Sequence, residues 1–195
     1  SFTVTGAVNG ADTLVATALG KTSAGYSVTV SGVEFGFLQP GADGAELPMN
    51  AAQAVRVRLL ENGAPAASQQ VTITTTRGTV TPSTVTTDAN GEATATITSA
   101  DAGFATITGT GPGGTTASRS VEFVATVPAK LALQASPNVV GVNLGTGGTN
   151  SSQLLAMVRD AADTPVKNQR VDFSALTDLS NGRVEPAYAI TDSNG

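Results

Sequence analysis

The chain of 195 residues contains no cysteine and no histidine. These absences exclude disulfides, Cys/His zinc sites, haem ligation by histidine, and catalysis by Ser-His-Asp or Cys-His groups. Most common enzyme mechanisms are therefore excluded. We predict that the chain is not an enzyme and that it uses no cofactor, with calcium as the one alternative to consider.

Charged residues are also scarce, at 13% of the chain, and the net charge is -5. No cluster of lysine and arginine provides the positive surface that binds a phosphate backbone, so we expect no nucleic-acid partner. The apolar runs are far shorter than the roughly 20 residues needed to cross a bilayer. We therefore expect no membrane insertion within this segment.

What the sequence does contain is an alternation, with period two, of valine or isoleucine with threonine, interrupted regularly by Gly, Pro, Asn or Asp. This pattern is typical of strands with one buried and one solvent-facing side. Such short strands in a segment of this length predict an all-β fold, an immunoglobulin-like β-sandwich, with an open barrel as the alternative. Between residues 32 and 126 the predicted strands are 33–38, 54–60, 69–76, 79–86, 92–98, 103–110 and 116–125.

The same alternation predicts which side chains face the core. They are nearly all aliphatic, so the expected core is poor in aromatic residues. The predicted inward residues are Val55, Val57, Leu59, Val71, Ile73, Val85, Ala93, Ala95, Ile97, Ala105, Ile107, Val121 and Phe123.

The chain is internally repetitive, which should be established before any fold is assigned. Residues 78–91, "GTVTPSTVTTDANG", match residues 182–195, "GRVEPAYAITDSNG", at seven of fourteen positions. Residues 1–30 match residues 94–123 without a gap and with eleven identities. The sequence therefore predicts tandem units with one complete and two partial copies.

The predicted domains are the closing strands of one unit at 1–31, a complete sandwich at 32–126, and the opening strands of a further unit at 127–195. The joints between them are only a few residues long and are not rich in Gly and Ser. Such joints are too short to act as flexible coils. We expect successive units to stand end to end as a semi-rigid rod.

The repeated segments resemble a known family. The central copy contains "TTDANGEATATITSADAGFATITGT" followed by "SVEFVA", and the next copy contains "VRDAADTPVKNQRVDFSA". These stretches are similar to the bacterial Ig-like repeats of the invasin and intimin type (bacterial Ig-like group 1). The matching motifs are turn and core positions, so the resemblance implies the fold and almost nothing about a ligand. Gly109 departs from the family pattern, which often has alanine there.

Two Asp-x-Asn-Gly turns are candidate calcium sites, because carboxylate and amide oxygens are typical calcium ligands. The ligands would be Asp88 and Asn90 in one turn and Asp192 and Asn194 in the other. The stronger interpretation is a tight hairpin turn, in which Asp and Asn favour the bend and Gly supplies a positive φ. Calcium at unit junctions would draw on Asp43, Glu46, Asp160 or Asp163.

Other possible sites have simpler interpretations. Carboxylates for glycoside hydrolysis would come from Glu92, Asp101 or Glu122, but Glu92 and Glu122 fall on polar strand faces and are expected to be solvated. The segment 109–116, "GTGPGGTT", lacks the following helix and the lysine of a phosphate-binding loop. It is expected to be a loop between two strands.

Three functions remain. The first is a non-catalytic structural repeat of a bacterial surface or secreted adhesin-like protein, extracellular or at the cell surface, whose partners are further copies of the repeat. The second is an extracellular fibre or sheath subunit that polymerises head to tail, with residues 1–31 donated as strands to the unfinished sandwich at 127–195. The third is glycan or receptor binding through strand-end loops. The second hypothesis assigns assembly contacts to Phe2, Val4, Leu14, Val28, Val30, Val171 and Phe173.

Overall fold

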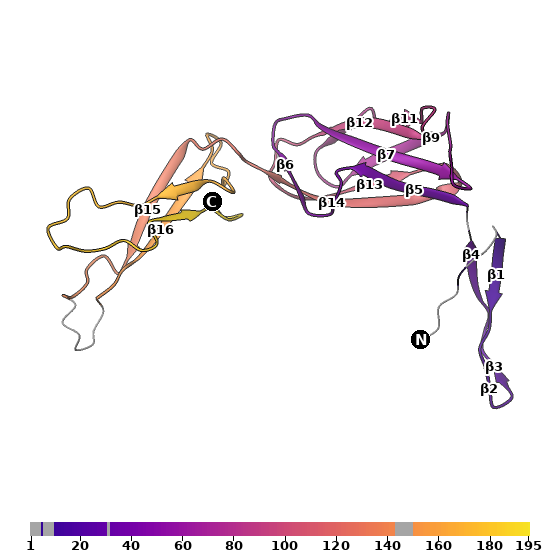
Figure 1. The fold of residues 1–195 in the computed structure, drawn as a ribbon, viewed down its shortest axis with the longest axis horizontal. Coiled ribbons are helices and arrows are strands. Elements are labelled where there is room, and N and C mark those ends of the chain that lie inside the picture. The colour runs from indigo at the N-terminus through magenta and orange to yellow at the C-terminus, as the bar shows by residue number, and fades with distance from the viewer. Residues whose placement is uncertain (1–4, 6–9, 31, 143–149) are drawn as a thin grey trace. The chain divides into compact units, whose positions relative to one another are not determined.

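The computed structural model describes residues 5, 10–30, 32–142 and 150–195, and β-strands predominate in it (Figure 1). The chain divides into two compact units. Unit 1 comprises Ser1–Ala45, Ala52–Thr98 and Ala105–Val121, and unit 2 comprises Glu46–Ala51, Ser99–Phe104 and Glu122–Gly195. The predicted all-β class is confirmed.

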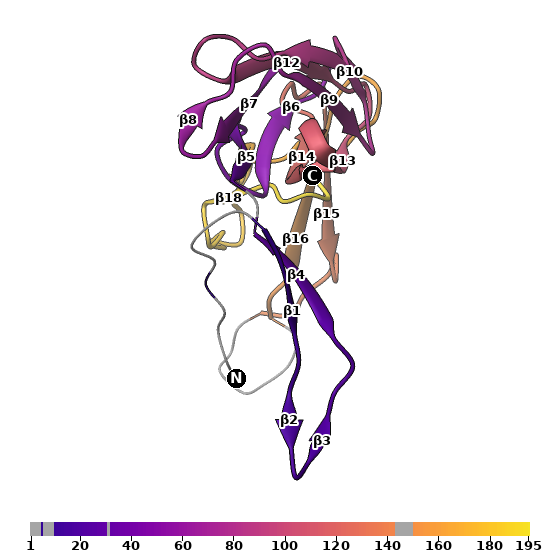
Figure 2. The same ribbon diagram turned by 90° about the vertical axis from the view of Figure 1, so that its right-hand side faces the viewer.

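The first strands form a long antiparallel hairpin (Figure 2). Its strands are β1 (Gly10–Leu14), β2 (Thr17–Ala18), β3 (Lys21–Thr22) and β4 (Tyr26–Val30), with β1 paired to β4 and β2 to β3. Leu14 lies opposite Tyr26 and Gly10 opposite Val30. Since directly opposed residues share a face, Leu14, Val28 and Val30 lie on one face of this hairpin.

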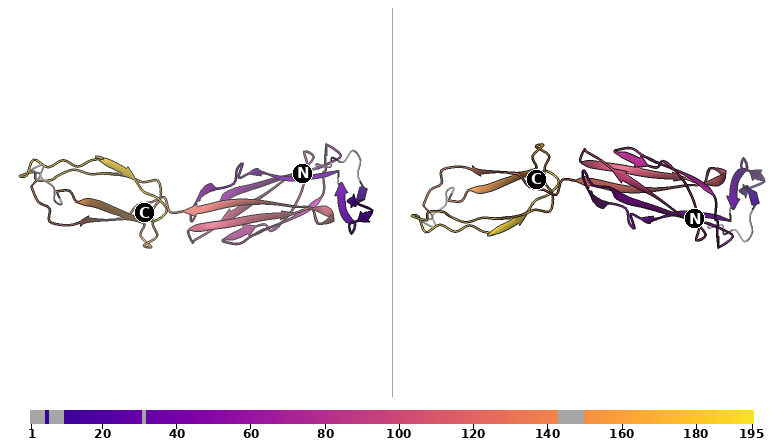
Figure 3. Two further views of the ribbon diagram at one scale, coloured as in Figure 1. Left: turned by 90° about the horizontal axis from the view of Figure 1, so that it is seen from below. Right: turned by 90° about the horizontal axis from the view of Figure 1, so that it is seen from above.

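The central segment forms a β-sandwich of two five-stranded sheets, whose strands run lengthwise through it (Figure 3). One sheet has the order β10-β12-β7-β5, with β8 also paired to β7, and the other has the order β11-β9-β13-β14-β6. The strands are β5 (Val33–Gln39), β6 (Ala45–Pro48), β7 (Gln53–Glu61), β8 (Ala64–Pro65), β9 (Gln70–Thr75), β10 (Thr79–Thr81), β11 (Thr84–Thr86), β12 (Glu92–Thr98), β13 (Gly103–Thr110) and β14 (Thr116–Val124). The loop predicted at 109–116 is confirmed as a short 3-10 turn, Pro112–Gly114, between β13 and β14.

The single strand predicted at 79–86 is wrong. It divides at Pro82 and Ser83 into β10 and β11, which pair with β12 and β9 respectively and so belong to different sheets. Proline has no amide hydrogen and cannot continue a ladder, so the chain passes from one sheet to the other here. The sequence reading also missed the short strands β6 and β8.

The predicted core is confirmed at twelve of its thirteen positions, all with less than a tenth of their surface exposed. The exception is Val85, which is half-buried because it lies on β11, a three-residue strand at the edge of its sheet. Alternation along the strands therefore identified most of the sandwich core, although it missed the buried residues Leu47, Ala66 and Val124.

In unit 2, two further antiparallel pairs follow: β15 (Lys130–Ser136) with β16 (Gln153–Arg159), and β17 (Arg170–Asp172) with β18 (Tyr188–Ile190). Their buried cluster is small and aliphatic. It consists of Ala125, Val158, Val166 and Val171, with Met49, Ala156 and Phe173 packed against it.

A buried threonine holds the central turn in place. The Thr87 hydroxyl donates to the Ala66 carbonyl at 2.6 Å and accepts a hydrogen bond from the Gln69 amide at 2.9 Å. The backbone amide of Thr87 donates to the Gln69 carbonyl, and that of Ser68 donates to the Thr87 carbonyl. Four hydrogen bonds thus attach residues 66–69 to one threonine.

The same arrangement recurs around Thr191 in unit 2. Its hydroxyl donates to the Val166 carbonyl at 2.6 Å and accepts from the Gln169 amide at 2.9 Å. Its backbone amide donates to the Gln169 carbonyl, and the Asn168 amide donates to the Thr191 carbonyl. The repeat found in the sequence is therefore a repeat of backbone structure.

Each turn ends on a glycine that the neighbouring strand approaches closely. Gly91 has a φ of 73°, and a Cβ there would overlap the Leu59 carbonyl oxygen. Gly195 has a φ of 92°, and a Cβ there would overlap the Val158 carbonyl oxygen. Glycine is required for its positive φ and for its lack of a side chain.

We predict that Gly91→Ala destabilises the sandwich far more than Gly63→Ala. Both residues have a positive φ, but a Cβ at Gly63 meets nothing within 4 Å. Gly63→Ala should lower the unfolding free energy by about 1 to 2 kcal/mol, the cost of a left-handed alanine. Gly91→Ala should cost at least about 2 kcal/mol more, because the backbone must move. Chemical denaturation checks this, and equal losses in the two variants would contradict it.

Candidate functional site

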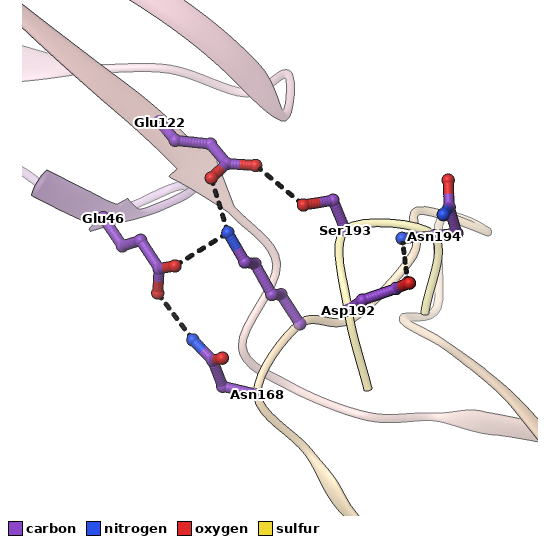
Figure 4. A network of polar contacts seen from close by, with 7 residues as sticks. Glu46, Glu122, Asn168, Asp192, Ser193 and Asn194 are labelled. Carbon is purple, nitrogen blue, oxygen red and sulfur yellow. Dashed lines mark hydrogen bonds and ion pairs between the residues drawn. The ribbon is translucent and has the colours of Figure 1, made fainter. Parts of the chain in front are cut away.

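A network of polar contacts in unit 2 centres on a lysine held between two glutamates (Figure 4). Lys167 lies between the bridge residue Val166 and β17. Its Nζ donates to Glu122 Oε2 at 2.6 Å and lies 2.8 Å from Glu46 Oε1. Glu46 is on β6 and Glu122 on β14, which are adjacent strands of one sheet.

Two further side chains complete the group. Asn168 Nδ2 donates to Glu46 Oε2 at 2.5 Å, and Ser193 Oγ donates to Glu122 Oε1 at 3.3 Å (Figure 4). Each carboxylate thus has a partner on both oxygens. We call these five residues, Glu46, Glu122, Lys167, Asn168 and Ser193, the Lys167 network.

The turn structure of unit 2 positions the network. Lys167 and Asn168 lie between the two residues whose backbone the Thr191 hydroxyl binds, Val166 and Gln169. Ser193 lies in the next turn, where Asp192 Oδ1 accepts the Asn194 amide at 2.8 Å. The contacting side chains are therefore carried on a backbone that is fixed by other residues.

The charges in the network shift one another's ionisation. The hydrogen bond from Lys167 lowers the pKa of Glu46 below its ordinary 4.5. The hydrogen bond to Glu122, followed by that to Glu46, raises the pKa of Lys167 above its ordinary 10.5. Both groups are therefore charged across the neutral range.

The expectation that Glu122 is solvated is wrong. Only 8% of this residue is exposed, because Lys167 and Ser193 cover the polar side of β14 at this point. Glu92 fits the expectation better, since it forms a looser ion pair with Arg56 at 3.4 Å. The Lys167 ammonium and the Ser193 hydroxyl thus donate to both oxygens of the Glu122 carboxylate.

Sequence reasoning missed most of the Lys167 network. Glu46 was considered only as a calcium ligand, and Asn168 and Ser193 were not considered. A signal was present in the repeat itself: where the backbone is the same, the central copy has Ala67 and Ala89 at the places of Lys167 and Ser193. Such differences between equivalent positions indicate contacts outside the unit's own core.

The predicted turn at Asp88 is confirmed. Asp88 Oδ1 accepts the amides of Asn90 at 2.8 Å and Glu92 at 2.9 Å, and these hydrogen bonds, that from Glu92 first, lower the pKa of Asp88. Asp192 and Asn194 form the corresponding turn. The carboxylates of both turns are engaged with their own backbone.

The other calcium candidates also have protein partners. Asp43 binds Arg119 and the Ser120 amide, Asp160 accepts the Thr164 amide, and Asp163 binds Lys130. Within the described residues, no three acidic side chains come together as a metal site. Calcium binding, like its absence, stays a prediction.

The residues assigned to assembly fall in separate places. Phe2 and Val4 lie outside the described residues. Leu14, Val28 and Val30 are half-buried in the first hairpin, which belongs to unit 1. In unit 2, Val171 is buried and Phe173 packs against the same cluster.

Residues 49–124 match the family model of the bacterial Ig-like domain (group 1). This segment covers the two-sheet sandwich from β7 to β14 and leaves out its first two strands, β5 and β6. The central domain is a bacterial Ig-like domain. The resemblance seen in the turn and core motifs is confirmed over these residues.

Solved structures with similar folds include tandem domains of bacterial proteins. The D0-D1 domain of intimin is 22% identical with a TM-score of 0.41, covering 83% of this chain and 80% of that one. Invasin, a bacterial integrin-binding protein, is 24% identical with a TM-score of 0.40, covering 83% of this chain and 34% of that one. Domains 4–9 of the surface layer protein SbsC are 20% identical with a TM-score of 0.39, covering 96% of this chain and 31% of that one.

The chain thus spans about a third of the invasin and SbsC chains that it matches. No curated protein sequence matches it. In the part of the chain that the structure describes, no helix has the length and apolar character needed to cross a membrane.

The structure explains the family departure at Gly109 in the Ig-like domain. A Cβ at this position would lie 2.9 Å from two atoms of the Phe35 ring, closer than side chains pack. The aromatic ring of β5 therefore occupies the space that an alanine side chain at β13 would use. The large Phe35 side chain on one sheet is thus compensated by the absence of a side chain at Gly109 on the other.

We predict that the Lys167 network gives unit 2 a pH-dependent stability. The lowered pKa of Glu46 means that its contribution is present above its ordinary 4.5 and is lost as the pH falls through the lowered value. The raised pKa of Lys167 means that its contribution is present below its ordinary 10.5 and is lost as the pH rises through the raised value. The difference in Tm between the chain and Lys167→Met should be constant between these limits and shrink outside them. A difference independent of pH would contradict the assignment.

We also predict that removal of calcium leaves the Tm unchanged. The carboxylates of the candidate sites already bind lysine, arginine or backbone amides. A bound ion that prefers the folded state raises stability, so calorimetry with excess chelator and with excess calcium measures its presence. A Tm that rises with calcium would contradict this prediction.

Proposed function

We propose that the chain is a non-catalytic structural segment of a bacterial cell-surface or secreted adhesin-like protein, in which Ig-like repeats follow one another as a semi-rigid stalk or filament. The observation that carries this proposal is the repeated backbone structure around Thr87 and Thr191. A second copy of the turn and its attached strand implies a second domain of the same type. Its partners are further copies of the repeat.

The hydrogen bonds of the short linker support stiffness. Ala125 forms a parallel bridge with Val166, and the Ala129 amide donates to the Arg159 carbonyl at 2.8 Å. All these residues belong to unit 2. The linker, residues 126–129, is exposed, but it is short and the chain is paired at both of its ends, which limits its flexibility.

The outward strand faces suit a spacer. β9, β12 and β13 alternate buried aliphatic residues with threonines, as in Thr72, Thr94 and Thr106. Such a surface is polar with little charge, so it stays hydrated without attracting nucleic acid or membrane. We propose on this basis that the segment acts by its length and attachment and uses no cofactor.

The surface location is tested by single-cysteine labelling, because the natural chain has no cysteine. Thr106→Cys places a thiol on the exposed side of β13, and Ile107→Cys places one on the adjacent, fully buried position as a matched control. In intact bacteria expressing the full protein, a membrane-impermeant maleimide should label only Thr106→Cys. Labelling of Thr106→Cys only after cell lysis would contradict the proposed location.

A second candidate is head-to-tail assembly by strand donation, favoured by an uncovered apolar face in unit 2. Leu131 and Leu133 pair with Val158 and Ala156, yet they are 65% and 61% exposed. In the central domain the corresponding residues of β5, Phe35 and Phe37, are covered by Gly109 of β13 and Arg119 of β14. The hairpin β1–β4 carries Leu14, Val28 and Val30 on one face and matches β13–β14 in sequence. Donation of this hairpin by another copy would complete the second sandwich.

Light scattering on the isolated chain separates the two candidates. Strand donation requires concentration-dependent oligomers, which Val28→Lys should abolish and Ser27→Lys, on the opposite face, should leave intact. The stalk proposal expects a monomer at all concentrations. Glycan or receptor binding through strand-end loops stays a prediction.

A further inference from the structure

We propose that the Lys167 network determines which repeat can follow the central Ig-like domain. Glu46 and Glu122 would bind a repeat that has Lys and Asn at the positions of Lys167 and Asn168, and Ser at the position of Ser193. A repeat without the lysine would fit less well. This inference rests on the proposed tandem arrangement. It adds that the joints are chemically distinct from one another.

The side chains of the network are separable from the fold of the repeat that carries them. At the positions of Lys167, Asn168 and Ser193 the central copy has Ala67, Ser68 and Ala89. The threonine hydrogen bonds around these positions are nevertheless the same, with lengths of 2.6 and 2.9 Å in both copies. The lysine is therefore not needed to form this backbone.

Burial gives the network its selectivity. Glu122 is 8% exposed, and its Oε2 binds the Lys167 ammonium at 2.6 Å. Removing one partner of a buried ion pair leaves the other charge desolvated and uncompensated, which is strongly unfavourable. A repeat with alanine at this position would leave Glu122 in that state. A repeat without the lysine therefore pays the free-energy cost of an unpaired Glu122, and a repeat with the lysine does not. In this way the contact discriminates between repeats.

The sequence supplies an independent observation. The match of residues 1–30 to 94–123 places Thr29 at the position of Glu122. Thr29 therefore precedes the copy that has Ala67, whereas Glu122 precedes the copy that has Lys167. At the first joint both positions are uncharged, with Thr29 and Ala67, whereas at the second joint the acidic Glu122 is matched by the basic Lys167. The two joints in this chain differ in a matched way.

The test is a double-mutant cycle in the full 195-residue chain. Lys167→Ala should lower the apparent Tm of unit 2 by leaving Glu122 unpaired. Glu122→Thr should lower it by leaving Lys167 with Glu46 alone. The double variant has the two residue types that the sequence match places at the preceding joint, threonine and alanine, and should recover most of the lost Tm.

An exposed ion pair in the same unit provides the control. Lys130 and Asp163 lie 2.9 Å apart, but their side chains are 53% and 66% exposed. Exposed pairs contribute little, so Lys130→Ala should leave the Tm nearly unchanged. Calorimetry measures all four variants. Additive losses in the double variant, or no loss in Lys167→Ala, would overturn the proposal. Neither result would bear on the surface location, which the cysteine labelling tests separately.

Discussion

The structure of both repeats depends on one buried threonine hydroxyl that binds two backbone groups. Thr87 and Thr191 each donate to a carbonyl at 2.6 Å and accept an amide at 2.9 Å. Both residues are buried, at 4% and 8% exposure, so an unpaired backbone group here would be costly. These bonds hold residues 66–69, and 166–169 in the second copy, against the Asp-x-Asn-Gly turn. The final glycine of the turn lets the neighbouring strand, β7 or β16, approach closely. The position of Lys167 and Asn168 follows from this contact, because they lie between the two residues that the Thr191 hydroxyl binds.

The chain separates the residues that make the fold from those that make the joint. The threonine, the turn aspartate and the glycine are the same in both copies, at Thr87, Asp88 and Gly91 and again at Thr191, Asp192 and Gly195. Three other positions differ: Ala67, Ser68 and Ala89 of the central copy are replaced by Lys167, Asn168 and Ser193, and these side chains are the ones that bind Glu46 and Glu122. A tandem protein can in this way keep one scaffold while giving each joint its own chemistry.

Much of this could be predicted from the sequence, because the dominant signals are local. Alternation predicted the first and last residues of β12 and β13 correctly. It also predicted most of the core of the sandwich, because each strand has one buried side. The division of the predicted strand at Pro82 was missed because β10 and β11 pair with different sheets. Such pairing depends on the tertiary structure, and the alternation of residues along one strand carries no information about it. Glu122 was taken as solvated for the same reason: the lysine that covers it lies 45 residues away in sequence. Only comparison of the two copies, position by position, would have indicated Lys167.

The central claim is that residues 166–195 repeat the backbone hydrogen bonding of residues 66–91. Amide hydrogen exchange followed by NMR tests it directly, because the Gln69 and Thr87 amides have exact counterparts in Gln169 and Thr191. The account predicts strong protection at all four amides, well above that of the exposed turn residues. Protection at Gln69 and Thr87 with rapid exchange at Gln169 and Thr191 would contradict it.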